Sequence, residues 1–278
     1  MRIKIGRALY AAFALAMLLL CILVPSEISV SVYDSLLFCG RTIIPQVFLG
    51  MVISSLVADM PLPKFISGKM RTVILLVICM LCGSPNGAVT AKRLYDTGAL
   101  DKKGAEMFCA CSGSVSASFM MGFVAETTKS NAAAITMLVS QIAVSLAVFC
   151  FAPFECGYSN ESKKSVVAAI KNACINCINV CGMIIFFSLP MALLQRNVYL
   201  PEGIMAILKG IFEFSSGVAA ANGDLKATAI ICGFGGLCVA AQVKSILESR
   251  LSAKPFLAVR LMSAALMGAL MALCEFFA

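Results

Sequence analysis

The sequence predicts an all-α polytopic membrane protein with an inverted-topology repeat and two re-entrant helical hairpins. Apolar residues make up 60% of the 278 positions, and the mean hydropathy is +0.96. Soluble domains are only about 45–50% apolar. The apolar segments are of helical length, and short polar loops that differ in their content of Lys and Arg separate them. We therefore expect a single membrane domain, residues 1–278, in contact with the lipid bilayer.

The first apolar run covers residues 8–24 and follows three basic residues, Arg2, Lys4 and Arg7. A helix needs about 20 apolar residues to cross about 30 Å of hydrocarbon. The run is longer than a signal-peptide core of about 7–15 residues, and VPSEIS after it is a poor cleavage site. We expect an uncleaved first span whose amino terminus is cytoplasmic.

Eight further apolar segments follow, and their flanking charges decide which of them cross, because Lys and Arg gather in cytoplasmic loops. They cover residues 35–58, 71–91, 105–125, 131–153, 166–194, 203–222, 227–247 and 256–276. Segment 71–91 has basic residues on both flanks: Lys64, Lys69 and Arg71 before it, and Lys92, Arg93, Lys102 and Lys103 after it. Both of its ends should therefore be cytoplasmic, and GSPNG in its middle supplies the turn of a re-entrant hairpin.

The same reasoning predicts that residues 203–222 form a second hairpin, which enters from the opposite side and turns at FSSG. Seven spans remain. With this topology, seventeen of the 22 Lys and Arg residues lie inside and four lie outside, while Arg41 falls within a span and should snorkel to the outer interface. Lys244, Arg250, Lys254 and Arg260 are counted with the inner residues. The asymmetry fits the positive-inside rule.

Residues 35–125 and 166–247 then share one plan of span, hairpin and Gly/Ser-interrupted span, in opposite orientations. Residues 131–153 connect the two repeats, and 256–276 form the last span. Transporters with inverted repeats bind substrate near the bilayer midplane, where broken helices meet. Irregular backbone at that depth must face protein or a water-filled cavity, so we expect the interruptions to line a site.

The candidate substrate-binding residues are the polar and small residues of these interruptions, together with an asparagine stripe spaced i, i+4, i+7 on residues 166–194. They are Gly83, Ser84, Pro85, Asn86, Gly87, Ser112, Ser114, Ser116, Glu213, Ser215, Ser216, Gly217, Gln242, Asn172, Asn176 and Asn179. Isolated polar side chains at membrane depth usually serve a function. The alternatives are close packing at the small residues and hydrogen bonding between spans at the asparagines.

Composition also argues against other classes. The net charge of +8 follows from membrane topology, so no nucleic-acid partner is expected. Most of the fourteen cysteines lie in apolar runs, where thiols pack as small hydrophobes, and histidine is absent. We expect no metal site and no cofactor. No nucleophile motif with a base partner is present, so no enzymatic activity is expected.

The stretch GSPNGAVTAKRLYDTGALDKKGAEMFCACSGSVSASFMMGFV resembles the nucleoside-recognition, or Gate-domain, membrane proteins, and more closely the YlbJ-like (SpoVV-type) sporulation integral membrane proteins. Gly83, Pro85, Gly87 and Ala88 match the family's G-x-P-x-G-A hairpin tip, and Phe119 and Gly122 match its F-x-x-G ending. The runs TIIPQVF, CGMIIFFS and GFGGLCVAAQ are also similar, so the likeness covers nearly the whole chain. Gly113, Ser114, Ser116 and Ala117 replace the family's Asn/Ser/Pro-rich break.

The resemblance implies transport of dipicolinate, a planar dicarboxylate, during sporulation, or of nucleosides as in the wider Gate group. We expect a secondary transporter or facilitator whose two hairpin tips alternately gate a midplane site. Half-helix amino termini and the hydroxyls of Ser84, Ser116 and Ser215 would hold an anion, and Glu213 would carry a coupling proton, with Na⁺ as the alternative coupling ion. The rival hypothesis is a non-transporting membrane scaffold or receptor in spore assembly. The oligomeric state stays open.

Overall fold

The computed structural model describes residues 15, 18, 19, 21–58, 67–157, 165–197 and 200–277. Most of these residues are helical, and there is no strand among them. Most of the predicted first span, 8–24, lies outside the described residues. So do Arg2, Lys4, Arg7, Lys64, Lys163 and Lys164.

The first described long helix begins ten residues earlier than the sequence predicts. It consists of α2 (Pro25–Phe38), a π-helical turn η1 (Cys39–Ile43) and α3 (Ile44–Ala58). Pro25 is at the first helical position, where its missing N–H costs no hydrogen bond, and Glu27 lies in the positive first turn. The VPSEIS segment, which the sequence analysis placed between two spans, is therefore the start of a helix.

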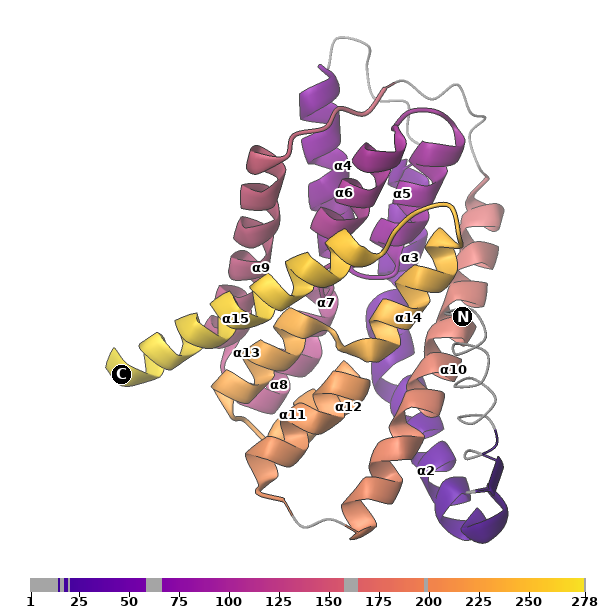
Figure 1. Ribbon diagram of the computed structural model, residues 1–278, viewed down its shortest axis with the longest axis vertical. Helices are drawn as coiled ribbons and strands as arrows, with labels where there is room; N and C mark the ends of the chain where they lie inside the picture. Colours follow the sequence, from indigo (N-terminus) through magenta and orange to yellow (C-terminus); the bar gives the residue numbers. More distant parts are fainter. Residues whose placement is uncertain are drawn as a thin grey trace, which may run out of the picture.

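The first hairpin consists of α4 (Gly68–Cys82) and α5 (Asn86–Asp96), with a turn at Gly83, Ser84 and Pro85 between them. The chain then returns through α6 (Lys102–Ser112), which packs along α5. In Figure 1 these three helices occupy the upper part of the molecule. The helical path breaks at residues 113–116. It resumes as α7 (Ala117–Phe119), a second π turn η2 (Met120–Val124) and α8 (Ala125–Thr128).

Two long helices connect this half to the next one. They are α9 (Asn131–Phe151) and α10 (Val166–Asn197), and α10 packs along both α2 and α3. Pro190 lies inside α10.

The second hairpin consists of α11 (Glu202–Phe212) and α12 (Phe214–Ala221), which lie in the lower part of Figure 1. Its turn is the single extended residue Glu213 (φ −141°, ψ 113°). The prediction that the chain turns at FSSG is wrong, because residues 214–217 form the first helical turn of α12. The broken span that follows comprises α13 (Leu225–Phe234) and α14 (Gly236–Leu247), which are separated at Gly235, and α15 (Lys254–Phe277) ends the chain.

Six helices are long and apolar enough to cross a membrane, counting only the described part of the chain. They are Pro25–Ile53, Lys102–Thr128, Asn131–Phe151, Val166–Met191, Leu225–Leu247 and Lys254–Phe276. They coincide with six of the seven predicted spans. The protein is therefore a multi-pass membrane protein, and the helices of both hairpins are individually too short to cross.

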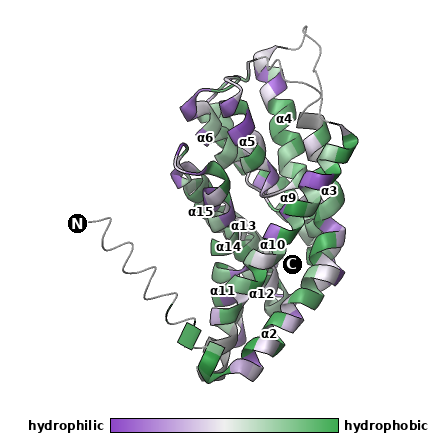
Figure 2. Ribbon diagram, turned by 90° about the vertical axis from the view of Figure 1, so that its right-hand side faces the viewer, coloured by the Kyte–Doolittle hydropathy of each residue, from purple (hydrophilic) through white to green (hydrophobic). Residues whose placement is uncertain are grey.

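Large apolar side chains face outward along these helices, as lipid contact requires. Leu49 of α3, Ile178 of α10 and Leu261 of α15 are all exposed. Figure 2 shows hydrophobic residues along the sides of the long helices and hydrophilic residues gathered near the ends of α5 and α6.

The two largest buried clusters each mix residues of both halves. One contains Phe108 of α6 and Leu76 of α4 together with Leu247 of α14. The other contains Ile231 of α13 and Val218 of α12 together with Phe119 of α7. Each hairpin thus packs against the second part of the other half's broken span.

Candidate substrate-binding cavity

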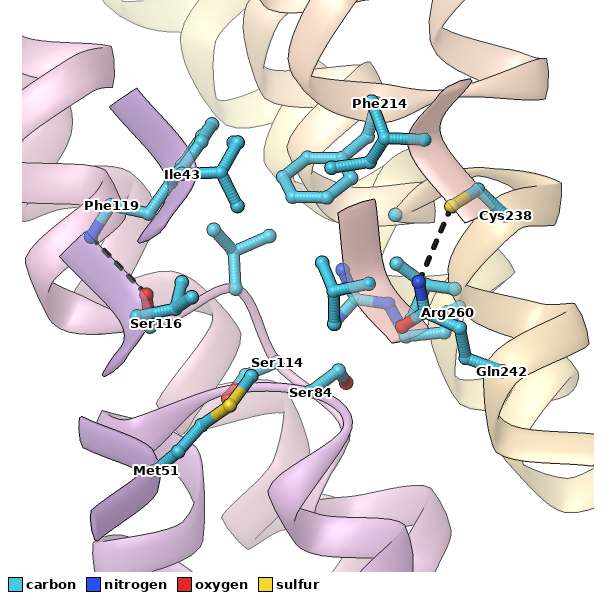
Figure 3. Close-up of a pocket in the computed structure, with 16 residues that line it drawn as sticks. Ile43, Met51, Ser84, Ser114, Ser116, Phe119, Phe214, Cys238, Gln242 and Arg260 are labelled. Carbon is cyan, nitrogen blue, oxygen red and sulfur yellow. Dashed lines mark hydrogen bonds between the residues drawn. The ribbon is translucent and has the colours of Figure 1, made fainter. Parts of the chain in front are cut away.

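A buried cavity, here called the central cavity, lies where the first hairpin turn meets the breaks of both interrupted spans. Its polar lining comes from Ser84, Ser114, Ser116, Gln242 and Arg260. Its apolar lining includes Ile43, Val47, Met51, Phe119, Val180 and Phe214. Figure 3 shows Arg260 and Gln242 on one side of the cavity and Ile43 and Phe119 on the other. The guanidinium and the amide therefore face a mostly apolar side, on which Ser116 lies next to Phe119.

The central cavity is small in this conformation, at about 40 Å³ for water-sized spheres. A single water needs about 10–15 Å³ on the same measure. The space thus accommodates a few waters, and a planar solute with one ring requires the walls to move apart. The conformation is closed around the cavity.

The first hairpin turn is fastened to the break that follows α6. Ser84 donates its backbone N–H to the carbonyl of Ser114 (2.8 Å), and the Ser114 hydroxyl donates to the carbonyl of Met80 (2.7 Å). Gly83 has φ +77°, and a Cβ there would lie 2.6 Å from the backbone nitrogen of Ser116. Only glycine permits both the conformation and this approach. The turn and the break therefore form one unit.

Gln141 of α9 satisfies the backbone of the same break. Its amide nitrogen donates to the carbonyl of Val115 (2.8 Å), and its oxygen accepts the N–H of Val115 (3.2 Å). Gln141 is fully buried. Gln141 is not among the predicted site residues. It could have been found as a lone amide inside an otherwise apolar span, because such a group is costly unless it is paired.

Arg260 of α15 was also missed, because its charge was counted with the inner loops. It is 3% exposed and lines the central cavity. Its Nη1 donates to the carbonyl of Gly113 (2.6 Å), Nε donates to that of Phe234 (3.3 Å), and Nη2 donates to that of Cys232. Arg260 therefore joins the carboxyl ends of α6 and α13, one from each broken span. Its position within the predicted last span was the available signal.

Glu213 at the second turn is fully buried and acts as the amino-terminal cap of α12. Its carboxylate accepts the backbone N–H of Ser215 (3.0 Å), the hydroxyl of Ser215 (2.6 Å) and the backbone N–H of Ser216 (2.7 Å). These bonds satisfy two of the otherwise free amide groups of the helix start. Neither Glu213 nor Ser215 lines the central cavity, to which this hairpin contributes Phe214 instead.

Two further cavities flank the central one along α10 and the long helix formed by α2, η1 and α3. The α5 vestibule, of about 280 Å³, is lined by Asn86, Thr90 and Arg93 of α5, Met51 and Ser55 of α3, and Asn172 and Asn176 of α10. The α2 vestibule, of about 670 Å³, is lined by residues of α2, α10 and the second hairpin. They include Ser31, Asp34, Ser188, Lys209 and Ser216.

Eight of the sixteen predicted site residues line one of the three cavities. Ser84, Ser114, Ser116 and Gln242 meet in the central cavity, Asn86, Asn172 and Asn176 line the α5 vestibule, and Ser216 lines the α2 vestibule. The remaining candidates line none of these three cavities: Gly83, Pro85, Gly87, Ser112, Glu213, Ser215, Gly217 and Asn179. Asn172 and Asn179 are exposed, because the packed face of α10 is formed by Ala169, Ala173 and Cys177.

No protein-family model, curated protein or solved structure matches this chain.

Proposed function

We propose that the protein is a membrane transporter, a secondary transporter or facilitator of a small planar polar solute, with the central cavity as its binding site. The observation that carries the proposal is the meeting of one hairpin turn, one residue next to the other hairpin turn, and both helix breaks around one buried, partly polar space. Broken helices at membrane depth are costly unless they line a cavity.

The two halves are proposed to be an inverted-topology repeat, with each hairpin entering the membrane and returning on the same side. The order of elements supports this. A long helix, a hairpin of two short helices and a broken helix occur in α2 to α8 and again in α10 to α14. The two hairpins lie toward opposite ends of the molecule (Figure 1). Such repeats permit alternating access around a fixed site.

The three cavities support a route between α10 and the long helix formed by α2, η1 and α3. Met51 lines both the α5 vestibule and the central cavity. On the other side, Ile184 lines the central cavity and Ser188, about one helical turn further along α10, lines the α2 vestibule. A solute moving along this helix pair would pass the vestibules and the central cavity in succession.

The lining favours a solute with a flat apolar face and polar edges. Phe119 and Phe214 offer aromatic surfaces, and Ser84, Gln242 and Arg260 offer hydrogen-bond donors. Dipicolinate, moved during sporulation, fits this description and follows from the family resemblance. A nucleoside, as in the Gate group, is the alternative solute.

The experiment is uptake into proteoliposomes that contain the purified protein. Labelled dipicolinate or a labelled nucleoside should enter faster than into protein-free vesicles, and the uptake should saturate. If both solutes enter both vesicle types equally, the transporter proposal fails, and the rival role as a non-transporting scaffold or receptor gains support. Repeating the uptake with H⁺ or Na⁺ gradients identifies the coupling ion.

A second experiment tests the route. Single cysteines replace Asn176 in the α5 vestibule and Ser31 in the α2 vestibule, in a chain whose native cysteines have been replaced. A membrane-impermeant thiol reagent should block uptake through one cysteine from one side only and through the other cysteine from the opposite side. A cysteine at Asn179, outside the three cavities, is the matched control and should tolerate labelling. Block of both variants from the same side contradicts the route.

A further inference from the structure

Arg260 is the one charged residue among the described residues that line the central cavity. A buried charge is costly unless it is paired. Arg260 has three carbonyl acceptors, on Gly113, Phe234 and Cys232, and no ion pair with a carboxylate is found for it in the described part of the chain. Its positive charge is therefore held by neutral groups.

These three bonds leave some N–H groups of the guanidinium unused. It has five N–H groups, and the three bonds use one from each nitrogen, so one N–H remains on each of Nη1 and Nη2. Both can donate to a carboxylate oxygen, and charge-assisted bonds of this kind are among the stronger hydrogen bonds.

The nearby helix ends do not cancel the charge. Each helix terminus carries roughly half an elementary charge, positive at the amino end and negative at the carboxyl end. Three helix breaks meet at the cavity, α4 to α5, α6 to α7 and α13 to α14, and each places one carboxyl end beside one amino end. The charges of the two kinds of helix end therefore largely offset one another, and the guanidinium charge remains. The cavity therefore carries about one net positive charge.

We propose that Arg260 is a substrate-binding residue that selects carboxylate solutes, and this proposal rests on the proposed transport function. One carboxylate of the solute binds the free Nη1 and Nη2 hydrogens. The Ser84 hydroxyl and the Gln242 amide donate to the remaining polar edge, and the ring lies against Phe119 and Phe214. A neutral solute of the same shape leaves the arginine charge unpaired and binds less tightly.

Arg260 also joins two helix ends, so its removal would disturb the fold as well as the site. Gln242→Glu avoids this problem, because it places a carboxylate on the same side of the cavity with almost no change of volume (Figure 3). The new carboxylate would pair with the guanidinium and leave the three carbonyl bonds in place. Gln242→Leu is the matched control, since it removes the amide without adding charge.

The test compares pyridine-2,6-dicarboxylate with its neutral diamide, measured as uptake and as equilibrium binding to the purified protein. The wild type should prefer the dicarboxylate by about tenfold or more. Gln242→Glu should lose that preference, while Gln242→Leu should retain most of it. Each variant should elute as a single species in detergent.

The outcomes separate the two proposals. A wild type that transports neither pyridine compound nor a nucleoside contradicts the transport function. A wild type that transports a solute, together with a Gln242→Glu variant that keeps the full carboxylate preference, overturns the role of Arg260 alone. Equal wild-type uptake of dicarboxylate and diamide also overturns it.

Discussion

The two hairpin turns occupy equivalent places in the two halves but are closed by different means. The first turn, Gly83 to Pro85, relies on backbone: a glycine with positive φ and a hydrogen bond from Ser84 to Ser114 of the following break. The second turn relies on a side chain, the carboxylate of Glu213, which caps its own next helix. The first turn is thus tied to a neighbouring segment, and the second is complete within its hairpin.

This difference decides what each hairpin gives to the central cavity. The backbone of the first turn is satisfied by the neighbouring break, which leaves the Ser84 side chain to line the cavity. In the second hairpin the polar groups of residues 213–216 bond to one another, and Phe214 is what lines the cavity. A shared order of elements therefore does not imply shared chemistry. The polar lining comes from the first turn, the break that follows α6, α14 and α15, and the second hairpin supplies an aromatic surface.

Gly83→Ala should have the largest effect on stability, because it disrupts the contact between the first turn and the break that follows α6. At φ 77° and ψ 175° the backbone is in a region open essentially only to glycine, which costs a side chain about 1–3 kcal/mol. The clash with Ser116 adds about 1–3 kcal/mol. We expect loss of folded protein, or a strongly lowered midpoint of thermal unfolding in detergent.

Gly98→Ala is the control for this prediction. Gly98 also has positive φ (+72°), but a Cβ there meets nothing within 4 Å. This variant should lower the unfolding midpoint much less. Equal losses for the two alanine variants would show that the backbone conformation alone matters, and that the close approach to Ser116 does not.

Gly217→Ala tests the second hairpin in the same way. Gly217 is helical, and a Cβ there would lie 2.3 Å from the Cα of Gly210 in α11. Separating the two helices should cost about 1–3 kcal/mol. The measurement is again thermal unfolding in detergent. Gly182→Ala in α10, where nothing lies within 4 Å, should be neutral or stabilising by up to about 1 kcal/mol. A Gly217→Ala variant as stable as Gly182→Ala would contradict the tight packing of this hairpin.

The long helices could be predicted from the sequence because their signals are local. Apolar length and flanking charge located six described spans, and GSPNG marked the first turn. The second turn lies before the predicted position. Serine and glycine suggested a turn at residues 214–217, but these residues are helical, and the turn is at Glu213, which caps the amino end of that helix. A cap depends on where one carboxylate points, and residue type alone does not determine this.

The candidate site was only partly predictable, because its key contacts join segments far apart in the chain. Ser84, Ser114, Ser116 and Gln242 were selected as polar residues at helix breaks and do meet in the central cavity. Arg260 lies 147 residues from Gly113, to which it donates. In the sequence, a single basic residue near a loop is interpreted as a sign that the loop is cytoplasmic. Only the packing of α15 against both breaks shows that Arg260 is buried.

Glu213→Gln should have an intermediate effect and would show how far the second turn depends on its cap. The amide keeps one acceptor oxygen but loses the charge, so we expect a loss of about 0.5–2 kcal/mol in the free energy of unfolding. Asp224→Asn is the matched cap variant. Asp224 accepts a single backbone N–H, that of Ala227, and its loss should be smaller. The reverse order of stabilities would contradict the capping role of Glu213.

The same variant tests whether Glu213 carries a coupling proton, as the sequence analysis expects. If uptake by Glu213→Gln keeps the wild-type pH dependence, Glu213 does not have that role.

Ser84→Ala should have the smallest effect on stability and a selective effect on transport. The backbone N–H that ties the turn to Ser114 is kept, and only the hydroxyl on the cavity wall is lost. One lost hydrogen bond of about 1 kcal/mol should raise the substrate KM about fivefold. Ser112→Ala is the control, because the Ser112 hydroxyl bonds to the carbonyl of Phe108 (2.6 Å) and lines none of the three cavities. Its KM should stay at the wild-type value. The opposite result is a wild-type KM for Ser84→Ala and a raised KM for Ser112→Ala. The first turn would then contribute no hydrogen bond to the substrate, and the two hairpins would not differ in what they give to the binding site.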